Sequence, residues 1–143
     1  MLEVKGIENG IVIDHISAGN GIKIFNRLLA EHIVNPVVLL MNAESGKLGK
    51  KDIIKLADVF EIDLDMLGLI DQNITVNVIK DSNVIRKYGA VVPEEVTGLF
   101  KCDNPRCISN SDSYAVPNFK LFSKNGAVNY ICSYCEEITK FRL

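Results

Sequence analysis

The sequence lacks the features that would place it in a membrane, in a nucleic-acid complex or outside the cell. Its longest apolar run, Pro36 to Met41, is far shorter than the roughly 20 residues that cross a bilayer. No basic segment followed by an apolar one opens the chain, so a signal peptide is not expected. Lys and Arg number 16 against 18 Asp and Glu, and this net charge of -2 offers no positive excess for phosphate backbones. We therefore expect a soluble, cytoplasmic protein.

Glycine and proline are also scarce, at 10 and 4 of 143 residues, which excludes a fibrous or low-complexity chain. With 48% apolar residues, the length suits one medium domain or two small ones. Gly and Pro interrupt the periodic pattern between Tyr88 and Glu95, and we place a linker there. The expected domains are 1–93 and 94–143, with 10 basic and 12 acidic residues in the first and 6 of each in the second.

Apolar periodicity divides the first part into strands and helices. Runs rich in β-branched residues predict four strands, the second of them short and buried: Gly10–Ile16, Val37–Met41, Lys51–Phe60 and Ile74–Ile79. The spacing in Lys51–Phe60 also fits a helix, and its β-branched content favours the strand. Apolar residues at intervals of three and four predict one helix over Ile22–Ile33, and Asp63–Ile70 reads as a second, short one.

The resulting order, β-α-β-β-α-β, is the split pattern of a ferredoxin-like sandwich, an α+β fold with two helices on one face of an antiparallel sheet. Residues Asn83–Lys87 extend or return the last strand. Such a sheet commonly leaves its other face for a ligand or a partner.

The four cysteines are absent from the first 101 residues and lie together in the last 42. Cys102-x4-Cys107 and, after 24 residues, Cys132-x2-Cys135 match a closed tetrahedral zinc site with four thiolate ligands. Thiolates favour zinc or an iron–sulfur centre over calcium or magnesium, and a catalytic zinc would need an open position. We expect one structural zinc ion in a small, all-β, zinc-ribbon-like domain whose folding depends on it.

Polar candidates in the first part are an Asp-His pair on the first strand and two pairs of cations: Asp14, His15, Lys51, Lys55, Arg86 and Lys87. Each pair alone is more often structural or a solvated face. Together they offer a carboxylate for ribose hydroxyls and cations for phosphates, the minimum set for a nucleotide site.

Motifs of independent catalysis are missing. Gly46–Lys51 departs from a Walker loop, and Gly19-x-Gly21 lacks the third glycine of a dinucleotide fingerprint because Ile24 occupies that position. The two histidines, His15 and His32, fit no Ser-His-Asp, Cys-His or HExxH arrangement. The sequence therefore argues against an enzyme acting alone.

Several motifs occur in one order: Ile11–Ile16, Ser45-Gly46-x-x-Gly49-x-Lys51-Asp52-x-Ile54-Lys55, Thr75-Val76-Asn77, Cys102-x4-Cys107-Ile108-Ser109 and Cys132-x2-Cys135-Glu136. From about Leu2 to the C-terminus, this ordered set resembles the regulatory chain of aspartate carbamoyltransferase. The resemblance implies an allosteric nucleotide-binding domain and a zinc domain that docks on the catalytic chain, in pyrimidine biosynthesis. The chain itself would not catalyse.

Members of this family form regulatory homodimers that bridge catalytic trimers, with CTP, often with UTP, as inhibitor and ATP as activator. By resemblance, Asp14 and Lys55 contact ribose and base, Lys87 contacts the triphosphate, and the rest of the pocket consists of Ile7, His15, Asn77, Ile79 and Val84. The short arm before Ile7 and Ser82 depart from the family pattern, and both bear on base preference. The alternatives are a zinc-ribbon nucleic-acid-binding protein and a small nucleotide-dependent enzyme.

Overall fold

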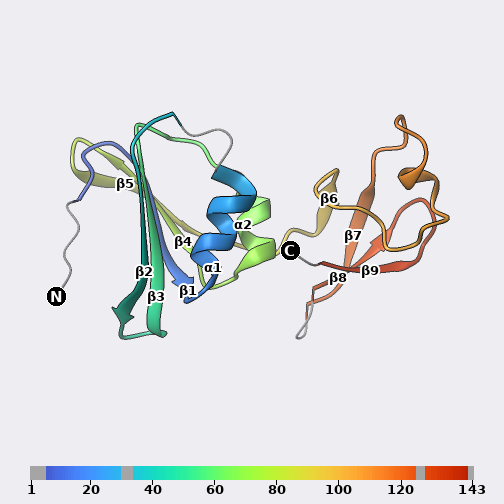
Figure 1. Ribbon diagram of the computed structural model, residues 1–143, viewed down its shortest axis with the longest axis horizontal. Helices are drawn as coiled ribbons and strands as arrows, with labels where there is room; N and C mark the ends of the chain where they lie inside the picture. Colours follow the sequence, from blue (N-terminus) through green and yellow to red (C-terminus); the bar gives the residue numbers. More distant parts are fainter. Residues whose placement is uncertain (1–5, 30–33, 125–127, 142–143) are drawn as a thin grey trace. The chain divides into compact units, whose positions relative to one another are not determined.

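The computed structural model describes residues 6–29, 34–124 and 128–141 of the chain. The chain divides into two compact units, Met1–Val91 and Val92–Leu143, each with its own sheet (Figure 1). Among the described helices, none is long and apolar enough to cross a membrane. The predicted linker starts too early, because Tyr88 and Gly89 pair with Val76 and Thr75 in the sheet of the first unit.

The first unit is a five-stranded antiparallel sheet with helices on one face (Figure 1). Its elements are β1 (Gly10–Ser17), α1 (Asn20–Ile24), a π-helical turn η1 (Phe25–Leu29), β2 (Val37–Ser45), β3 (Gly49–Ala57), α2 (Leu64–Ile70), β4 (Thr75–Lys80) and β5 (Asn83–Gly89). The strands lie in the order β2-β3-β1-β4-β5. The predicted β-α-β-β-α-β sandwich is therefore confirmed, and β5 returns beside β4 as a fifth strand at the edge.

Alternation along the strands gives the sheet one buried face. The buried core cluster joins residues of the three central strands to residues of both helices and the adjoining loops: Ile11, Ile13, Ile16, Ile24, Ile54, Leu56, Leu67, Ile74, Val76, Val78 and Ala90. Strand residues between these point to the opposite face, because successive side chains of a strand alternate. This second face is the one that the helices leave open.

The second predicted strand exists, but the prediction that it is short and buried is wrong. β2 continues to Ser45, lies at the edge of the sheet, and leaves Val38 and Met41 exposed. An apolar run does not reveal whether its strand will have one neighbour or two, so the edge position could not be read from composition. The ambiguous segment after Gly49 is a strand, as its β-branched residues indicated.

The predicted helix over Ile22–Ile33 is confirmed only in part. α1 begins at Asn20 and passes into η1, and residues 30–33 lie outside the described part of the chain. Ile24 is fully buried, whereas Ile22 is 40% exposed. Two residues two positions apart on a helix point in nearly opposite directions, so both could not face the core.

Two bulges flank β3 near the same position. The pairing of β1 with β3 shifts between Ile13 and Ile16, and the pairing of β2 with β3 shifts between Leu40 and Ala43. Inside these shifts, His15 and Asn42 have positive φ angles of 55° and 62°. Bulges increase local twist and change the direction of the side chains around them, and both bulges face the same part of β3.

Asp52 of β3 lies between these bulges and is fully buried. Its Oδ1 accepts the backbone N–H of Asn42 at 3.0 Å, and its Oδ2 accepts those of Gly19 at 3.0 Å and Gly21 at 2.9 Å. The carboxylate therefore caps the N-terminus of α1, where the glycine at the cap position has no side chain to do so. A Cβ at Gly21 would lie 2.8 Å from Asp52, so this contact requires glycine.

The second unit is a small four-stranded sheet. Its elements are β6 (Glu95–Thr97), a 3-10 turn η2 (Ile108–Asn110), β7 (Asn118–Ser123), β8 (Asn129–Cys132) and β9 (Ile138–Lys140), and the strands follow one another in this order across the sheet. Phe119 and Tyr130 are fully buried, and Phe100 stacks on Phe119 with ring centroids 4.4 Å apart. This core is too small to stabilise a domain of about 50 residues securely without a crosslink or a metal.

We predict that Asp52→Asn destabilises the first unit by about 3 kcal/mol. An amide accepts hydrogen bonds only through its oxygen, so the substitution leaves buried N–H groups without an acceptor. Urea unfolding followed by NMR signals of the first unit measures this. Asp58→Asn is the matched control, since Asp58 is exposed and its φ of 58° suits asparagine equally well. Equal stability of the two variants would contradict the role given to Asp52.

Candidate functional site

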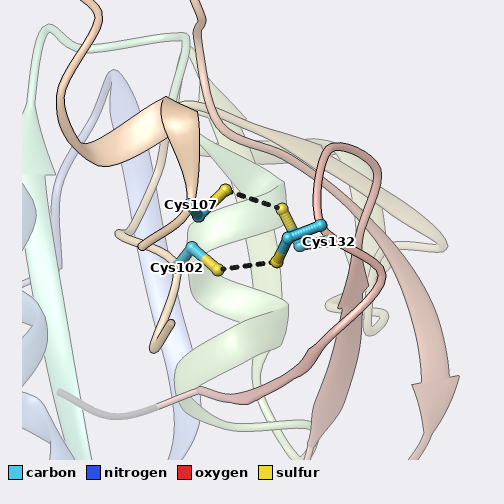
Figure 2. Close-up of side chains that lie close together, drawn as sticks. Cys102, Cys107 and Cys132 are labelled. Atoms are coloured by element: carbon cyan, nitrogen blue, oxygen red, sulfur yellow. Dashed lines mark hydrogen bonds between the residues drawn. The ribbon is translucent and has the colours of Figure 1, made fainter. Parts of the chain in front are cut away.

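The four cysteines of the second unit form one cluster. Cys102 and Cys107 flank the turn before η2, Cys132 ends β8, and Cys135 lies in the turn that leads to β9. All four Sγ atoms lie within 4.8 Å of one another. Cys102 and Cys135 are 3.6 Å apart and Cys107 and Cys132 are 3.7 Å apart, so sulfurs of the two pairs face each other (Figure 2).

Backbone N–H groups point at these sulfurs. Cys102 accepts from the N–H of Asn104, and Cys107 accepts from the N–H of Ser109, each two residues further along the chain. Cys132 accepts from the N–H groups of both Tyr134 and Cys135. Donors directed at a sulfur favour its thiolate form, which is the form that binds a metal.

The proton affinities of the thiols differ across the cluster. Burial raises the pKa of Cys102 to about 12 and also raises the pKa of Cys132. Hydrogen bonds from the hydroxyl and N–H of Ser109 lower the pKa of Cys107 to about 7. Without a cation, Cys102 and Cys132 therefore keep their protons at neutral pH. A metal ion must displace these protons, so its uptake weakens as the pH falls.

The cluster fits a tetrahedral metal ion. A tetrahedron with metal–sulfur bonds of about 2.3 Å has sulfurs about 3.8 Å apart, close to the two separations above. Four thiolates complete such a coordination shell and leave no position for water or substrate. The arrangement can therefore crosslink the two cysteine-bearing turns, 102–107 and 132–135, which we call the two knuckles, and the strands attached to them. It offers no site for catalysis by the metal.

Six of the eight residues predicted for the nucleotide lie on the open face of the first unit's sheet. Residues directly opposite each other in neighbouring strands share a face, and Lys55, Val12, Asn77 and Lys87 form one such row across β3, β1, β4 and β5. The next row towards one end contains Ile79 and Val84, and the next towards the other end contains Asp14 opposite Thr75.

The other two predicted residues lie at the ends of these rows. Ile7 is half-buried, and its Cδ1 is 3.1 Å from the position that a Cβ on Gly10 would take, beside the row of Ile79. His15 lies in the β1 bulge, and its Nδ1 is 2.8 Å from the hydroxyl of Thr75, opposite Asp14. The sheet therefore brings together strand residues up to 73 positions apart in the sequence, from Asp14 to Lys87.

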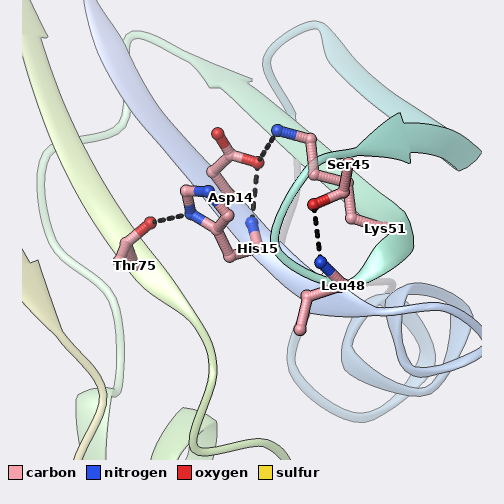
Figure 3. Close-up of polar contacts among 6 residues, drawn as sticks. All are labelled: Asp14, His15, Ser45, Leu48, Lys51 and Thr75. Atoms are coloured by element: carbon pink, nitrogen blue, oxygen red, sulfur yellow. Dashed lines mark hydrogen bonds and ion pairs between the residues drawn. The ribbon is translucent and has the colours of Figure 1, made fainter.

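Asp14 forms an ion pair with Lys51, with Nζ and Oδ1 2.9 Å apart (Figure 3). Oδ1 also accepts the backbone N–H of His15, which the bulge turns towards it. Burial raises the pKa of Asp14, but the hydrogen bond and charge of Lys51 and the N–H of His15 outweigh it, so the net pKa is lowered. The carboxylate is therefore charged at neutral pH and available to hydroxyl donors.

The sequence named Lys51 as a cation but did not include it, or Thr75, among the site residues. Lys51 and Lys55 are four apart, which on a strand places both side chains on the same face. The strand period, applied to β3, would therefore have added Lys51. Nothing in the local sequence indicates Thr75, because its contact with His15 depends on the bulge.

Comparisons with known proteins agree with this two-part organisation. The family model described as aspartate carbamoyltransferase regulatory chain, allosteric domain, matches residues 2–90, and the one described as the metal binding domain of that chain matches residues 94–142. The aspartate carbamoyltransferase regulatory chain of Clostridium acetobutylicum is 47% identical over 98% of this chain and 95% of the relative. The same chain of Clostridium tetani is 47% identical over 98% and 97%, and that of Bifidobacterium longum 37% over 97% and 99%.

We predict that Lys51→Met raises the pKa of Asp14, because it removes the hydrogen bond and the positive charge of Lys51, which counteract the rise in pKa caused by burial. NMR titration of the Asp14 carboxyl carbon measures this, and Lys50→Met is the matched control one residue away. The ion pair stabilises the fold above the unfolded pKa of Asp14, and this contribution is lost as the pH falls through the lower folded pKa. An Asp14 titration identical in wild type and Lys51→Met would contradict the pairing.

We predict that Cys135→Ser unfolds the second unit and leaves the first unit folded. Metal-binding free energies of small four-ligand domains are about 10 kcal/mol or more, which exceeds what the core of this unit can replace. Two-dimensional NMR of the full chain separates the two units, and wild type treated with a chelator should give the same spectrum. Dispersed signals for residues 95–140 in the variant would show that the metal is not required.

Proposed function

The chain belongs to the family of aspartate carbamoyltransferase regulatory chains, and from this we propose that its first unit binds CTP, UTP or ATP and its second unit docks on the catalytic chain. The observation that carries this proposal is that the two family models match in order, over 2–90 and 94–142, and that the regulatory chain of Clostridium acetobutylicum is 47% identical over 98% of this chain. As a regulatory chain, it is the noncatalytic subunit of the complex. A nucleic-acid-binding zinc ribbon is not favoured, since neither model describes one and the net charge is -2.

The open face of the first unit supports the nucleotide assignment by its chemistry. The charged carboxylate of Asp14 suits ribose hydroxyls, and the amide of Asn77 can both donate to and accept from a base edge. Lys55 and Lys87 end the polar row on the two sides of Val12 and Asn77, and they supply positive charge for phosphates. Ile7, Ile79 and Val84 add apolar surface beside this row, against which a base can pack.

We assign zinc to the cluster of Cys102, Cys107, Cys132 and Cys135. Thiolate ligands, a closed shell and the absence of any redox requirement in a structural role favour zinc over iron–sulfur chemistry. When bound, the ion supplies a crosslink between two knuckles and neutralises part of the thiolate charge. Reduced thiols in this number also suit the cytoplasm, where we place the protein.

The proposed assembly is a regulatory homodimer whose zinc domains bridge catalytic trimers in pyrimidine biosynthesis. Allosteric control then requires that a nucleotide bind with different affinity to two states of that assembly. The sheet of the first unit receives the nucleotide and the metal-dependent second unit contacts the catalytic chain, so sensing and attachment belong to separately folded parts.

We predict that Lys87→Ala weakens the binding of CTP and ATP more than that of cytidine and adenosine. The lost charge-assisted hydrogen bond is worth about 1.5 to 3 kcal/mol, roughly 10- to 150-fold in affinity. Calorimetric titration of nucleotides and nucleosides measures the difference. Lys80→Ala removes the same charge from the same hairpin on the other face of the sheet. Unchanged triphosphate affinity in Lys87→Ala would exclude Lys87 from the site.

Reconstitution with cognate catalytic trimers tests the function as a whole. Size-exclusion chromatography should show a complex with the metal-loaded chain. An activity assay of that complex should show a catalytic rate that responds to CTP or ATP. After removal of the metal with a thiol reagent, we predict that nucleotide still binds and the complex is lost. A loaded chain that forms no complex would refute the proposed function, whereas a stripped chain that still assembles would refute the role of the metal in attachment.

A further inference from the structure

Two hydroxyl groups approach the sulfurs of the first cysteine pair. The Oγ of Ser109 lies 3.1 Å from Sγ of Cys107, and Oγ1 of Thr139 lies 3.8 Å from Sγ of Cys102. Thr139 is on β9, which follows the second cysteine pair in the sequence, and it is only 1% exposed. A buried hydroxyl from a distant strand thus contacts a sulfur of the opposite knuckle.

The direction of the Thr139 hydrogen bonds follows from its other partner. Its Oγ1 accepts the backbone N–H of Asp103 at 3.0 Å. The one proton of the hydroxyl is therefore available to Cys102, and a metal-bound thiolate has no proton of its own to offer in return. Thr139 donates to the sulfur and at the same time holds the residue next to it.

These hydroxyls complete a pattern among the three sulfurs whose donors are known. Cys132 receives two backbone N–H groups, from Tyr134 and Cys135, as its tight x2 turn permits. Cys102 receives one backbone N–H, from Asn104 within the wider x4 turn, and Cys107 receives one, from Ser109 in η2. With the hydroxyls of Thr139 and Ser109 added, each of these three sulfurs has two donors.

Electrostatics explains what the second donor does. Four thiolates around a divalent cation carry a net charge of -2, and three of these cysteines are buried. Burying charge is costly unless hydrogen bonds compensate for the lost water. Outer-shell donors orient ligands and commonly change metal affinity by about 10- to 100-fold.

We propose that Thr139 and Ser109 are positioning residues of the metal centre, whose hydroxyls donate hydrogen bonds to the metal-bound sulfurs of Cys102 and Cys107 and thereby set how tightly the chain retains its metal. This inference rests on the proposed metal function of the cluster. A purely structural role for Thr139, satisfying the N–H of Asp103, would leave the electron density on the Cys102 sulfur unchanged. The two roles therefore differ in what they do to the bound metal.

The test uses the full chain loaded with Zn²⁺ or with Co²⁺, which reports thiolate ligands through a charge-transfer absorption band. Thr139→Val removes the hydroxyl with little change in volume, and Thr139→Ser keeps it. We expect Thr139→Val to lose about tenfold in Zn²⁺ affinity against a competing chelator and to shift the cobalt band to lower energy. Thr139→Ser should restore both values. Thr97→Val is the matched control, because the Thr97 hydroxyl contacts Asn118 rather than sulfur.

Ser109→Ala is the second arm and decides the matter if Thr139→Val does not fold, since it removes a hydroxyl from a partly exposed position. It should also shift the cobalt band to lower energy and weaken Zn²⁺ binding about tenfold. Unshifted bands and wild-type affinity in the folded variants would overturn the inference. A wild-type chain that binds neither Zn²⁺ nor Co²⁺ would instead overturn the proposed metal function.

Discussion

The geometry of the first unit depends on one buried carboxylate. Asp52 binds N–H groups of the β2 bulge and of the two glycines that start α1, so it fixes an edge strand and a helix to the centre of the sheet. The bulge in β1 lies beside the same position and brings the N–H of His15 to Asp14. Lys51 and Asp52 are consecutive on β3, so one side chain serves the open face and the next serves the buried face. The candidate nucleotide face and the attachment of the helix therefore share one dipeptide.

The second unit combines a small aromatic core with a cluster of four cysteines. Its aromatic core is small, and its cysteines are recruited from two turns that strand pairing alone would not hold together. Hydrogen bonds from backbone and hydroxyl groups prepare the sulfurs for charge, but burial keeps protons on Cys102 and Cys132 until a cation arrives. The first unit satisfies the buried charge of Asp52 with backbone N–H groups, whereas the second offers four sulfurs to a metal ion. The two units thus differ in how their buried polar groups are satisfied.

The sequence predicted the features that depend on local pattern. Strand and helix order, the strand between Gly49 and Ala57 and the paired cysteines all follow from periodicity, β-branched content and spacing. It failed where the outcome depends on distant residues: β2 is at an edge, Ile22 is exposed, and Tyr88 and Gly89 belong to a strand. The roles of Asp52, Thr75 and Thr139 were also invisible, because each acts through a partner at least ten positions away. The resemblance to a known family named most of the open-face residues, and pairing register explains why they can act together.

The placement of the four ligands has a consequence for synthesis on the ribosome. Chains fold from the N-terminus as they emerge, and every strand of the first unit is complete by Gly89. The first unit can therefore reach its folded state before Cys102 has emerged from the ribosome. A nascent chain lacks its fourth sulfur until Cys135 is added. Metal capture consequently follows the folding of the first unit, and a cell short of metal would hold molecules whose allosteric domain is finished and whose metal-binding domain is not.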